Sequence, residues 1–363
     1  MKTLIIFFPS IESGGVEKNF YHLINNLSDK FKKTIIVTSS YVEKKKLSKK
    51  INFLNANSSF CHNRSRIIKS IICFFLGLKL YSEKNKMILS FQSNIFSIIL
   101  SKIINCKVII RLNTAPEKYI HSSIKKFIFK IFYNLSDEII VNSYEFKKRI
   151  KKIFNLNSQV IYNPISLPKK INKKKIKFFN NYKHLKILTI GRLTDQKDYL
   201  TLIKSLNLLK KEGYKFKLYW IGRGYNYNKI LSEINNYELQ NCIKLAGYKN
   251  KAYEFMNSAN LFILSSRYEG LPNVLIEAQY MGVPIISSDC PSGPKEILLH
   301  GKAGTIFKTG NPEDLKDKIK SFLKNKNFFY KKSKYANKNL YRFKNKNFEK
   351  KYNKLLIKYL EEK

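Results

Sequence analysis

The chain has 363 residues, which exceeds one ordinary domain and suits two domains of roughly 150–200 residues each. Its 44% hydrophobic and 14% aromatic content is enough for packed cores and excludes an intrinsically disordered chain. The formal net charge of +44 invites a nucleic-acid-binding interpretation, because Lys and Arg neutralise phosphates.

The distribution of the basic residues does not support that interpretation. Only eight of the 69 are Arg, and the lysines are dispersed among abundant Ile, Asn, Phe and Tyr. We interpret this composition as the bias of an AT-rich genome, with attraction to an anionic membrane surface as the main functional alternative. The sequence contains no RRM, KH, helix-turn-helix or zinc pattern, so we expect no nucleic-acid partner.

The cysteines and the apolar runs bear on localisation. The five cysteines form no CxxC pair, which is typical of reduced thiols in a cytosolic protein. The apolar run at 4–8 is too short for a secretory signal peptide. The longest apolar segment, 67–81, is interrupted by Lys69 and Lys79 and falls short of the roughly 20 residues that a membrane span requires. We expect a cytoplasmic protein, placed at the inner face of the cytoplasmic membrane if segment 67–81 lies on lipid rather than in a core.

Short apolar runs alternate with helical patterns through the first half of the chain. Amphipathic segments such as 16–31 and 123–135 have apolar residues at three- and four-residue spacing. Contiguous apolar strands joined by helical crossovers predict a parallel sheet covered on both faces, over residues 1–165. The expected strands are 3–8, 33–39, 51–55, 87–91, 106–111, 138–143 and 159–163.

The pattern is interrupted at 166–183, where proline and a run of lysines predict a linker with little core. It resumes over 184–340, which predicts a second Rossmann-like domain, and a last helix at 341–363 is expected to pack back on the N-terminal domain. The architecture is therefore α/β, with two doubly wound units and a ligand cleft between them. The expected strands of the second unit are 186–191, 216–222, 242–247, 260–266, 283–289 and 304–307.

Two loops at expected strand ends carry residues suited to anions. Gly14 and Gly15 follow the first strand, where backbone N–H groups could approach a ligand oxygen, although a plain tight turn explains them equally well. Arg192 and Lys197 follow the first strand of the second half. Arg can grip a phosphate through two bonds and Lys adds a point charge, but from spacing alone a solvated surface is an equally good interpretation.

The segment SSRYEGLPNVLIEAQYMGVP, residues 265–284, predicts a helix that starts beside a turn. Pro272 suits the first helical position and Gly282 suits the stop. An open helix start favours an anion, because its backbone N–H groups lack partners. The N–H groups expected to be free are those of Gly270, Leu271, Asn273 and Val274.

Two glutamates flank this helix start. Glu269 is expected in the loop before the helix, and Glu277 within it. Carboxylates accept hydrogen bonds from vicinal hydroxyls, so the pair could hold a sugar and a ribose with a diphosphate between them. Two solvated surface charges are the alternative.

These motifs resemble those of retaining GT-B glycosyltransferases of family GT4. The glutamates have the E-x7-E spacing of that family, and the likeness extends to SGGVE at 13–17, IGRLTDQK at 190–197 and IGRGYN at 221–226, then over 246–298. Within the family, the chain is similar to bacterial enzymes that build capsule, O-antigen or other lipid-linked glycans. The resemblance implies transfer of a hexose or N-acetylhexosamine, from a UDP-linked donor, to a lipid-linked or lipopolysaccharide acceptor.

The resemblance also implies individual roles. Gly15, with its neighbour Gly14, would lie against the donor diphosphate. Arg192 and Lys197 would neutralise that diphosphate and stabilise it as it leaves. No DxD motif is present, so neither a divalent metal nor another cofactor is expected.

For the rest of the donor, the resemblance implies that Glu269 holds hydroxyls of the transferred sugar and Glu277 those of the ribose. The backbone of residues 270–274 would complete the sugar and phosphate contacts. Lys249 falls where the family places the nucleobase.

One departure from the family concerns the N-terminal domain, where many members have a His that faces the reacting carbon. The corresponding segment, CKVIIRLNTAPEKY, has no His, so Arg111 and Asn113 become the acceptor-side candidates, with His121 as the nearest histidine. Three alternatives remain open at this point: a basic nucleic-acid-binding protein, a GT-B sugar epimerase or phosphorylase, and an inactive binder.

Overall fold

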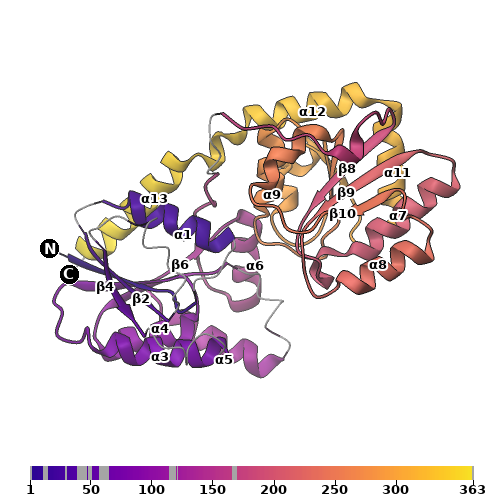
Figure 1. Ribbon diagram of the computed structural model, residues 1–363. Helices are drawn as coiled ribbons and strands as arrows, with labels where there is room; N and C mark the ends of the chain where they lie inside the picture. The colour runs from indigo at the N-terminus through magenta and orange to yellow at the C-terminus, as the bar shows by residue number, and fades with distance from the viewer. Residues whose placement is uncertain are drawn as a thin grey trace. The chain divides into compact units, whose positions relative to one another are not determined.

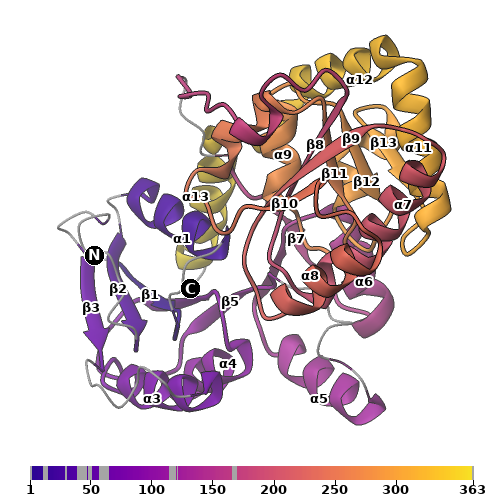
Figure 2. The same cartoon turned by 45° about the vertical axis from the view of Figure 1, so that its right-hand side comes forward.

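The computed structural model describes residues 2–10, 15–28, 31–38, 47, 51–56, 65–113, 120, 122–165 and 170–361. The chain divides into two compact units, which Figures 1 and 2 show from two directions. The first unit comprises Met1–Pro164 together with Asn345–Lys363, and the second comprises Ile165–Lys344. The last helix of the chain therefore belongs to the same unit as the N-terminus.

Within the described residues, the first unit is built on a parallel sheet of seven strands in the order β3-β2-β1-β4-β5-β6-β7. Ile5 pairs with Thr34 on one side and with Ile88 on the other, so the chain order reverses between β1 and β4. The strands are nearly continuous apolar runs because helices cover both faces of the sheet. Their bounds are β1 (Lys2–Phe7), β2 (Phe31–Val37), β3 (Ile51–Asn55), β4 (Lys86–Ser90), β5 (Lys107–Arg111), β6 (Glu138–Val141) and β7 (Gln159–Val160).

The helices of the first unit form two layers. On one face, α1 (Gly15–Asn26) and α13 (Asn345–Glu361) bury apolar side chains in a core that includes Leu4 and Ile6. On the other face, four helices share a core with Ile5 and the neighbouring strands. These are α3 (Arg66–Leu78), α4 (Asn94–Ile103), α5 (Ser123–Asn134) and α6 (Tyr144–Phe154).

The described part of the second unit contains a parallel sheet of six strands in the order β10-β9-β8-β11-β12-β13. Here β8 pairs with both β9 and β11, so the chain order reverses between β8 and β11. Such a reversal is a topological switch point, where the loops after the two strands separate to opposite faces. The bounds are β8 (Leu185–Ile190), β9 (Phe216–Ile221), β10 (Ile243–Leu245), β11 (Leu261–Leu264), β12 (Ile285–Ser288) and β13 (Thr305–Phe307).

Helices also cover the second sheet. The apolar side chains of α7, α8 and α11 share one core with its strands, and α9 packs against α10 and α12. The helix bounds are α7 (Tyr199–Lys211), α8 (Tyr227–Asn236), α9 (Asn273–Tyr280), α10 (Pro294–Ile297), α11 (Pro312–Lys324) and α12 (Lys326–Lys338). Short 3-10 turns are η3 (Lys177–Phe179), η4 (Asp195–Lys197), η5 (Ala252–Ser258), η6 (Leu299–Gly301) and η7 (Leu340–Phe343).

The segment expected to be a linker, 166–183, is part of the second unit from residue 170 onward. Ile176 and Phe179 are buried, and the Phe179 ring packs edge-on against Tyr219 of β9 with 6.1 Å between centroids. The backbone N–H of Lys174 donates to the carbonyl of Glu254 at 2.8 Å. The segment therefore has core contacts that its lysine-rich composition concealed.

The α/β architecture with a helical C-terminal region is confirmed. Each of the thirteen expected strands overlaps a strand of the structure, with limits that differ by a few residues. The helix expected after the Gly-Leu-Pro turn is α9, but Pro272 caps it and the first helical residue is Asn273. The proline has φ −70° and ψ 104°, which is an extended conformation that ends the preceding loop.

Candidate active site

The candidate site lies at the switch point of the second unit, where β8 and β11 run side by side. Loop 191–198 follows β8, and loop 265–272 follows β11. Ligands of doubly wound sheets bind outside the carboxyl ends of the strands at such points. Both loops carry residues that the sequence singled out: Arg192 and Lys197 on the first, Glu269 on the second.

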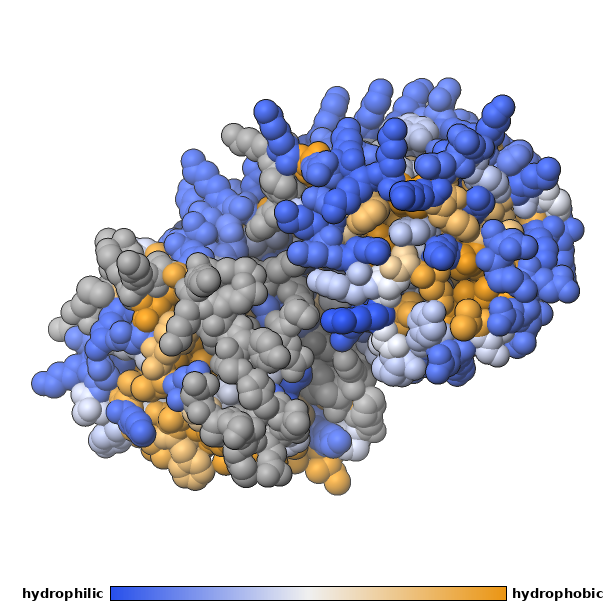
Figure 3. All heavy atoms as spheres, in the orientation of Figure 1, coloured by the Kyte–Doolittle hydropathy of each residue, from blue (hydrophilic) through white to orange (hydrophobic). Residues whose placement is uncertain are grey.

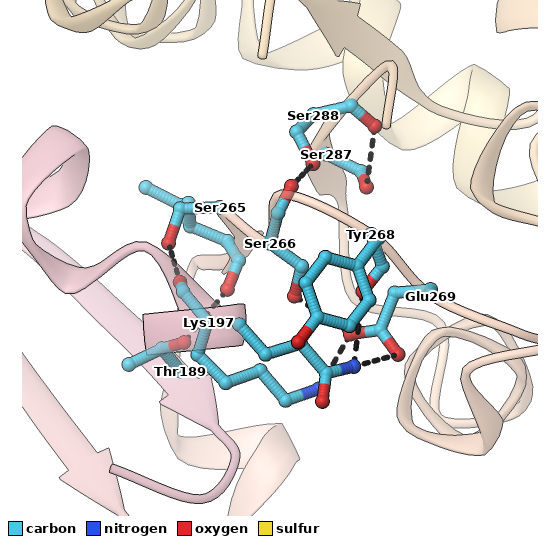
Figure 4. Close-up of polar contacts among 10 residues, drawn as sticks. Thr189, Lys197, Ser265, Ser266, Tyr268, Glu269, Ser287 and Ser288 are labelled. Carbon is cyan, nitrogen blue, oxygen red and sulfur yellow. Dashed lines mark hydrogen bonds and ion pairs between the residues drawn. The ribbon is translucent and has the colours of Figure 1, made fainter. Parts of the chain in front are cut away.

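Lys197 and Glu269 form an ion pair across these two loops (Figure 4). Lys197 Nζ lies 2.5 Å from Glu269 Oε1, and the two side chains are 15% and 8% exposed. The same carboxylate oxygen accepts a hydrogen bond from Ser266 Oγ at 2.6 Å, and Gln196 Nε2 makes a longer contact of 3.4 Å with Oε2. Glu269 is thus held in place, and its second oxygen is the more weakly bonded of the two.

Backbone contacts fix the two loops to each other. Ser265 Oγ donates to the carbonyl of Lys197 at 2.8 Å, and Gln196 Nε2 donates to the carbonyl of Tyr268 at 2.9 Å. The N–H of Arg267 donates to the carbonyl of Gln196 at 2.8 Å. Because these bonds join backbone to backbone or backbone to side chain, the positions of the charged groups depend on the loops and not on one flexible side chain.

The start of α9 presents unbonded donors next to this pair. Within the described residues, no group accepts a hydrogen bond from the N–H of Gly270, Leu271, Asn273 or Val274, and the first bonded amide is that of Leu275, which donates to Pro272 at 3.0 Å. The amide oxygen of Asn273 is also buried without a partner in the part of the chain that is described. Unpaired N–H groups at a helix start favour an anion.

Glu277 lies inside α9 and is half-buried. Its negative charge reaches Tyr253, whose pKa is raised, chiefly by burial and further by Glu254 and Glu277. Glu277 therefore lies within α9, about one helical turn after the first residue, as the sequence predicted.

Arg192 is exposed directly after β8, and within the described ranges its guanidinium has no hydrogen-bond or ion-pair partner. Its loop is packed closely against the loop that follows β9. A Cβ on Gly222 would lie 1.8 Å from the carbonyl oxygen of Gly191, and one on Gly224 would lie 2.3 Å from that of Leu193. These glycines of the IGR and IGRG motifs are needed because backbone meets backbone here.

Exposed groups lie at the ends of β9 and β10. The Arg223 guanidinium stacks on the Tyr248 ring, 5.0 Å from its centroid, and Tyr248 is 58% exposed. Lys249 is exposed beside it. Stacked planar groups at a strand end offer a surface on which a flat ring can lie.

A second segment supports Glu269 from the far side. The N–H of Glu269 donates to the carbonyl of Pro291 at 2.7 Å, and Ser292 Oγ donates to the carbonyl of Glu269 at 3.1 Å. Gly293 has φ +95°, and a Cβ on it would lie 1.9 Å from the carbonyl oxygen of Gly270. The PSGP sequence at 291–294 therefore shapes the loop that presents Glu269 and the start of α9.

The remaining candidates, Gly14 and Gly15 for the donor diphosphate and Arg111 and Asn113 for the acceptor side, belong to the first unit. Gly14 and His121 lie outside the described residues, and Gly15 is the first residue of α1. Asn113 is half-buried and both ends of its amide are used: it donates to the carbonyl of Phe91 at 2.9 Å and accepts from Arg111 Nε at 3.0 Å. Asn113 thus orients Arg111.

Arg111 was expected to face an acceptor, but its side chain is buried. It is 1% exposed, donates from Nη2 to Asn163 Oδ1 at 2.6 Å, and donates from Nη1 to the hydroxyl of Tyr352. Its guanidinium also lies 6.0 Å from the ring centroid of Phe348 and 5.7 Å from that of Tyr352. Arg111 therefore fastens α13 to the end of β5, and each of its three side-chain nitrogens donates a hydrogen bond within the first unit.

Comparison with known sequences assigns the second unit to a family. The family described as "Glycosyl transferases group 1" matches residues 170–343, which is nearly the whole of that unit. The second unit is a group 1 glycosyltransferase domain. The Lys197–Glu269 pair and the open start of α9 lie inside the matched region.

Two relatives illustrate the extent of the likeness. An uncharacterized glycosyltransferase of Methanocaldococcus jannaschii is 34% identical over 53% of this chain and 51% of its own, so the match spans about half of that relative. The N-acetylgalactosamine-N,N'-diacetylbacillosaminyl-diphospho-undecaprenol 4-alpha-N-acetylgalactosaminyltransferase of Campylobacter jejuni is 26% identical over 89% of this chain and 90% of its own. This glycosyltransferase is therefore similar to one relative along nearly its whole length.

The fold agrees with the family. The crystal structure of Anabaena HepE in complex with UDP has a TM-score of 0.78 with this chain, 18% identity, and coverage of 99% of this chain and 100% of that one. The fold of this glycosyltransferase is accordingly the GT-B fold.

The structure brings most of the residues predicted for this glycosyltransferase onto two neighbouring loops and one helix. Lys197 and Glu269 are in direct contact, and residues 270–274 and Glu277 continue from them along the chain. Lys249 lies on another loop of the same unit, after β10. Gln196, Ser266 and Ser292 hold Glu269 in place and were not among the predicted site residues. Gln196 and Ser266 lie inside the IGRLTDQK and SSRYEG motifs, and the PSGP segment that contains Ser292 was a usable signal.

Proposed function

We propose that this enzyme transfers a hexose or N-acetylhexosamine from a nucleotide-sugar, with UDP as the nucleotide, to a lipid-linked or surface-polysaccharide acceptor and retains the anomeric configuration. The observation that carries the proposal is the Lys197–Glu269 pair beside the open start of α9. It supplies, within a few residues, an anion site and a carboxylate that can hold hydroxyls.

In this proposal the donor diphosphate lies at the start of α9. The unbonded N–H groups of residues 270–274 and the positive end of the helix favour it. Arg192 and Lys197 add two cationic side chains. Negative charge accumulates on the diphosphate as the glycosidic bond breaks, so these groups stabilise the transition state more than the bound donor.

Glu269 and Glu277 would hold the two sugars. Glu269 Oε2 has only the long contact with Gln196 and can accept hydrogen bonds from hydroxyls of the transferred sugar. Glu277 would accept those of the ribose. Tyr248 and Lys249 would lie against the nucleobase, where the stacked ring offers a flat surface.

Retention follows if the acceptor hydroxyl attacks from the face that the diphosphate leaves. The bond between the anomeric carbon and the phosphate oxygen breaks, and a bond from that carbon to the acceptor oxygen forms. The proton of the acceptor hydroxyl passes to the departing phosphate oxygen, which is the base on that face. The role of Arg192 and Lys197 is to hold that phosphate while its charge grows.

The Campylobacter relative, whose name specifies a sugar on diphospho-undecaprenol, supports a lipid-linked acceptor for this chain. Such an acceptor lies in a membrane, and the net charge of +44 favours an anionic bilayer surface. We place the enzyme at the inner face of the cytoplasmic membrane. The cations and the helix start would take the place that a divalent metal holds in other transferases.

A thermal-shift panel of nucleotides tests the donor assignment, because a ligand at 100 times its Kd stabilises the folded state by about 2.7 kcal/mol. UDP and UDP-sugars should raise the Tm, and ADP, GDP and CMP should not. The Arg192→Ala variant should lose most of the shift. Equal shifts with all nucleotides, or none with any, would contradict the proposal.

Product analysis separates transfer from the alternatives. Incubation with a UDP-sugar and a lipid-linked acceptor should release UDP and extend the acceptor by one sugar in an α or β linkage that matches the donor. An epimerised nucleotide-sugar without acceptor extension would instead identify an epimerase. Inorganic phosphate as an effective co-substrate would identify a phosphorylase.

A further inference from the structure

Helix α3 of the first unit exposes its apolar side chains. Ile67, Ile71 and Phe75 recur every four residues and are 65%, 39% and 62% exposed. The fully buried residues of the helix are small, namely Ser70, Cys73 and Gly77, and Phe74, Leu76 and Leu78 are partly buried against the core. A Cβ on Gly77 would lie 2.3 Å from a methyl group of Leu100, so α3 sits very close to α4. The apolar residues of α3 therefore extend beyond the side that packs on the core, onto the outer side that a surface helix usually keeps polar.

Helix α5 has the same character. Its exposed apolar side chains fall at the spacing of one helical stripe, while Tyr133 is the buried residue of the helix. Ile124 and Phe127 are 73% and 63% exposed. The stripe consists of Ile124, Phe127, Ile128, Ile131 and Leu135.

The two stripes belong to one layer of the unit. Both α3 and α5 pack against α4, and in Figure 1 they lie along the same edge of the first unit. Ile103 at the end of α4 is also exposed. Figure 3 shows apolar surface gathered in that region. We call the outer sides of these helices, with Ile67, Ile71, Phe75, Ile103, Ile124, Phe127, Ile128 and Ile131, the α3–α5 face.

The charges of this face have one sign. Neither α3 nor α5 contains an Asp or Glu, and exposed or half-exposed cations flank both stripes. The acids that follow the helices are engaged elsewhere: Glu83 pairs with Lys32 at 3.1 Å, and Asp137 Oδ2 accepts from the N–H of Val108 at 2.7 Å. The cations are Arg66, Lys69, Lys79, Lys125, Lys126 and Lys130.

We propose that the α3–α5 face docks on an anionic phospholipid bilayer, with Phe75 and Phe127 inserted among the acyl chains and the lysines at the headgroups. Apolar side chains beside cations, without acids, match the chemistry of such a surface. This proposal rests on the proposed function, because it assumes an acceptor held in lipid. It adds which surface of the first unit contacts that lipid. Among the helices of the described ranges, none is long and apolar enough to cross a bilayer.

A second copy of the chain is a poorer occupant of this face. Two such faces brought together would oppose six cations to six cations with no acid on either helix, and like charges repel. A nucleic acid would pair with the lysines but would leave the exposed isoleucines without an apolar partner. A bilayer satisfies both the charges and the apolar stripes.

The test is sedimentation of the full chain with phosphatidylcholine vesicles, with and without phosphatidylglycerol, at low and high salt. The wild type should bind the anionic vesicles and should bind pure phosphatidylcholine much less. Phe75→Ser with Phe127→Ser should weaken binding by roughly tenfold or more, because two aromatic side chains no longer leave water. Lys125→Gln, Lys126→Gln and Lys130→Gln together should weaken it and remove most of its salt dependence.

Matched variants in the second unit control for lost apolarity and charge. Phe328→Ser with Tyr330→Ser removes two exposed aromatic side chains from α12, and Lys204→Gln, Lys211→Gln and Lys215→Gln together remove the same number of cations as the lysine variant. Both controls should bind vesicles as the wild type does. Equal loss in the controls, or undiminished binding by the Phe75/Phe127 variant, would overturn the assignment of the α3–α5 face.

Two further readouts separate this proposal from the proposed function. The UDP thermal shift of the Phe75/Phe127 variant should equal that of the wild type, which also shows that the variant is folded. If the wild type binds vesicles but no nucleotide raises its Tm, the transferase proposal is contradicted and the docking proposal is not. Size-exclusion chromatography could instead show a dimer that the same substitutions convert to a monomer. That result would identify a second copy as the occupant of the α3–α5 face and would contradict the bilayer-docking proposal.

Discussion

Lys197 Nζ contacts Glu269 Oε1 at 2.5 Å, and this ion pair joins the loops that leave β8 and β11 at the switch point of the second sheet. Both side chains are largely buried, so each charge depends on the other for compensation. Ser266 donates to the same carboxylate oxygen, which leaves Oε2 of Glu269 the more available for a ligand. The pair thus places a cation and an acceptor side by side before any donor binds.

Lys197→Met should reduce kcat/KM by on the order of 10²–10³, because it removes a cation that we propose stabilises the developing charge of the diphosphate. Methionine keeps a similar apolar stem, so the packing over Gly191 is retained. Steady-state kinetics with a UDP-sugar measures the loss. Lys204→Met, an exposed lysine in the middle of α7, removes the same charge from the same unit and should change kcat/KM little.

Glu269→Ala and Arg192→Ala should each reduce transfer to a similar extent, since one removes the proposed contact with the transferred sugar and the other a proposed contact with the diphosphate. Far-UV circular dichroism should remain that of the wild type. Turnover near the wild-type rate in either variant would show that the site lies elsewhere.

Glu277→Ala should raise the KM for the nucleotide-sugar by about 10- to 100-fold, as expected for loss of hydrogen bonds to a charged acceptor, with a smaller effect on kcat. The informative substrate is the 2′-deoxyribose analogue of the donor. The wild type should discriminate against it, and the variant should not. Glu233→Ala on α8 is the matched control, and persistent discrimination by Glu277→Ala would remove the ribose assignment.

The sheets and the placement of the second-unit candidate residues were predictable because their signals are local. A parallel strand covered on both faces is a contiguous apolar run, and such runs appear in the sequence at every strand of the structure. Arg192, Lys197 and Glu269 each lie in the loop that follows such a run, so the rule that ligands bind at strand ends places them together.

Arg111 had the same local signal and a different outcome. It too ends a strand, but its partner Tyr352 lies 241 residues away on α13, and no local pattern reports that contact. The interlocking of Ser292 and Gly293 with residues 269–270 is likewise a tertiary contact. A polar residue at a strand end therefore predicts a site only where no distant segment covers it.

Tyr352→Phe should destabilise the first unit by about 1–3 kcal/mol, because it leaves a buried Arg111 donor without an acceptor. Urea unfolding followed by far-UV circular dichroism should show the loss. Trp220, the single tryptophan, lies in β9 of the second unit, so its fluorescence transition should move little. Tyr330→Phe, on the exposed side of α12, is the control, and its free energy of unfolding should stay within about 0.5 kcal/mol of the wild type. A Tyr352→Phe variant as stable as that control would show that Arg111 does not need the Tyr352 hydroxyl as an acceptor.

Asp289 should make the second unit sensitive to acid. Partial burial acts to raise the pKa of this carboxyl, but the N–H and hydroxyl of Thr309 and the ammonium of Lys295 hold it below its ordinary value. A depressed pKa contributes stability that is present above the unfolded value of about 3.9 and is lost as the pH falls through the folded value. Asp289→Asn should therefore be less stable than the wild type at pH 7, and the difference should vanish in acid. Urea unfolding followed by Trp220 fluorescence measures the stability of the wild type and of Asp289→Asn at each pH. If the difference in stability persists in acid, it comes from packing and not from the charge of Asp289.

Transfer should survive removal of divalent metals. Arg192, Lys197 and the unbonded amides of residues 270–274 supply positive charge where the diphosphate would lie, so the leaving group is neutralised by the chain itself. Excess EDTA should therefore change kcat by less than about twofold, a small effect beside the loss expected from removing one of these cations. The Arg192→Ala variant is the useful companion: if added Mg²⁺ restores its activity, the metal is replacing the missing guanidinium. If EDTA instead abolishes wild-type transfer and Mg²⁺ restores it, the two cations do not carry the leaving group, and a metal must be assigned to the site.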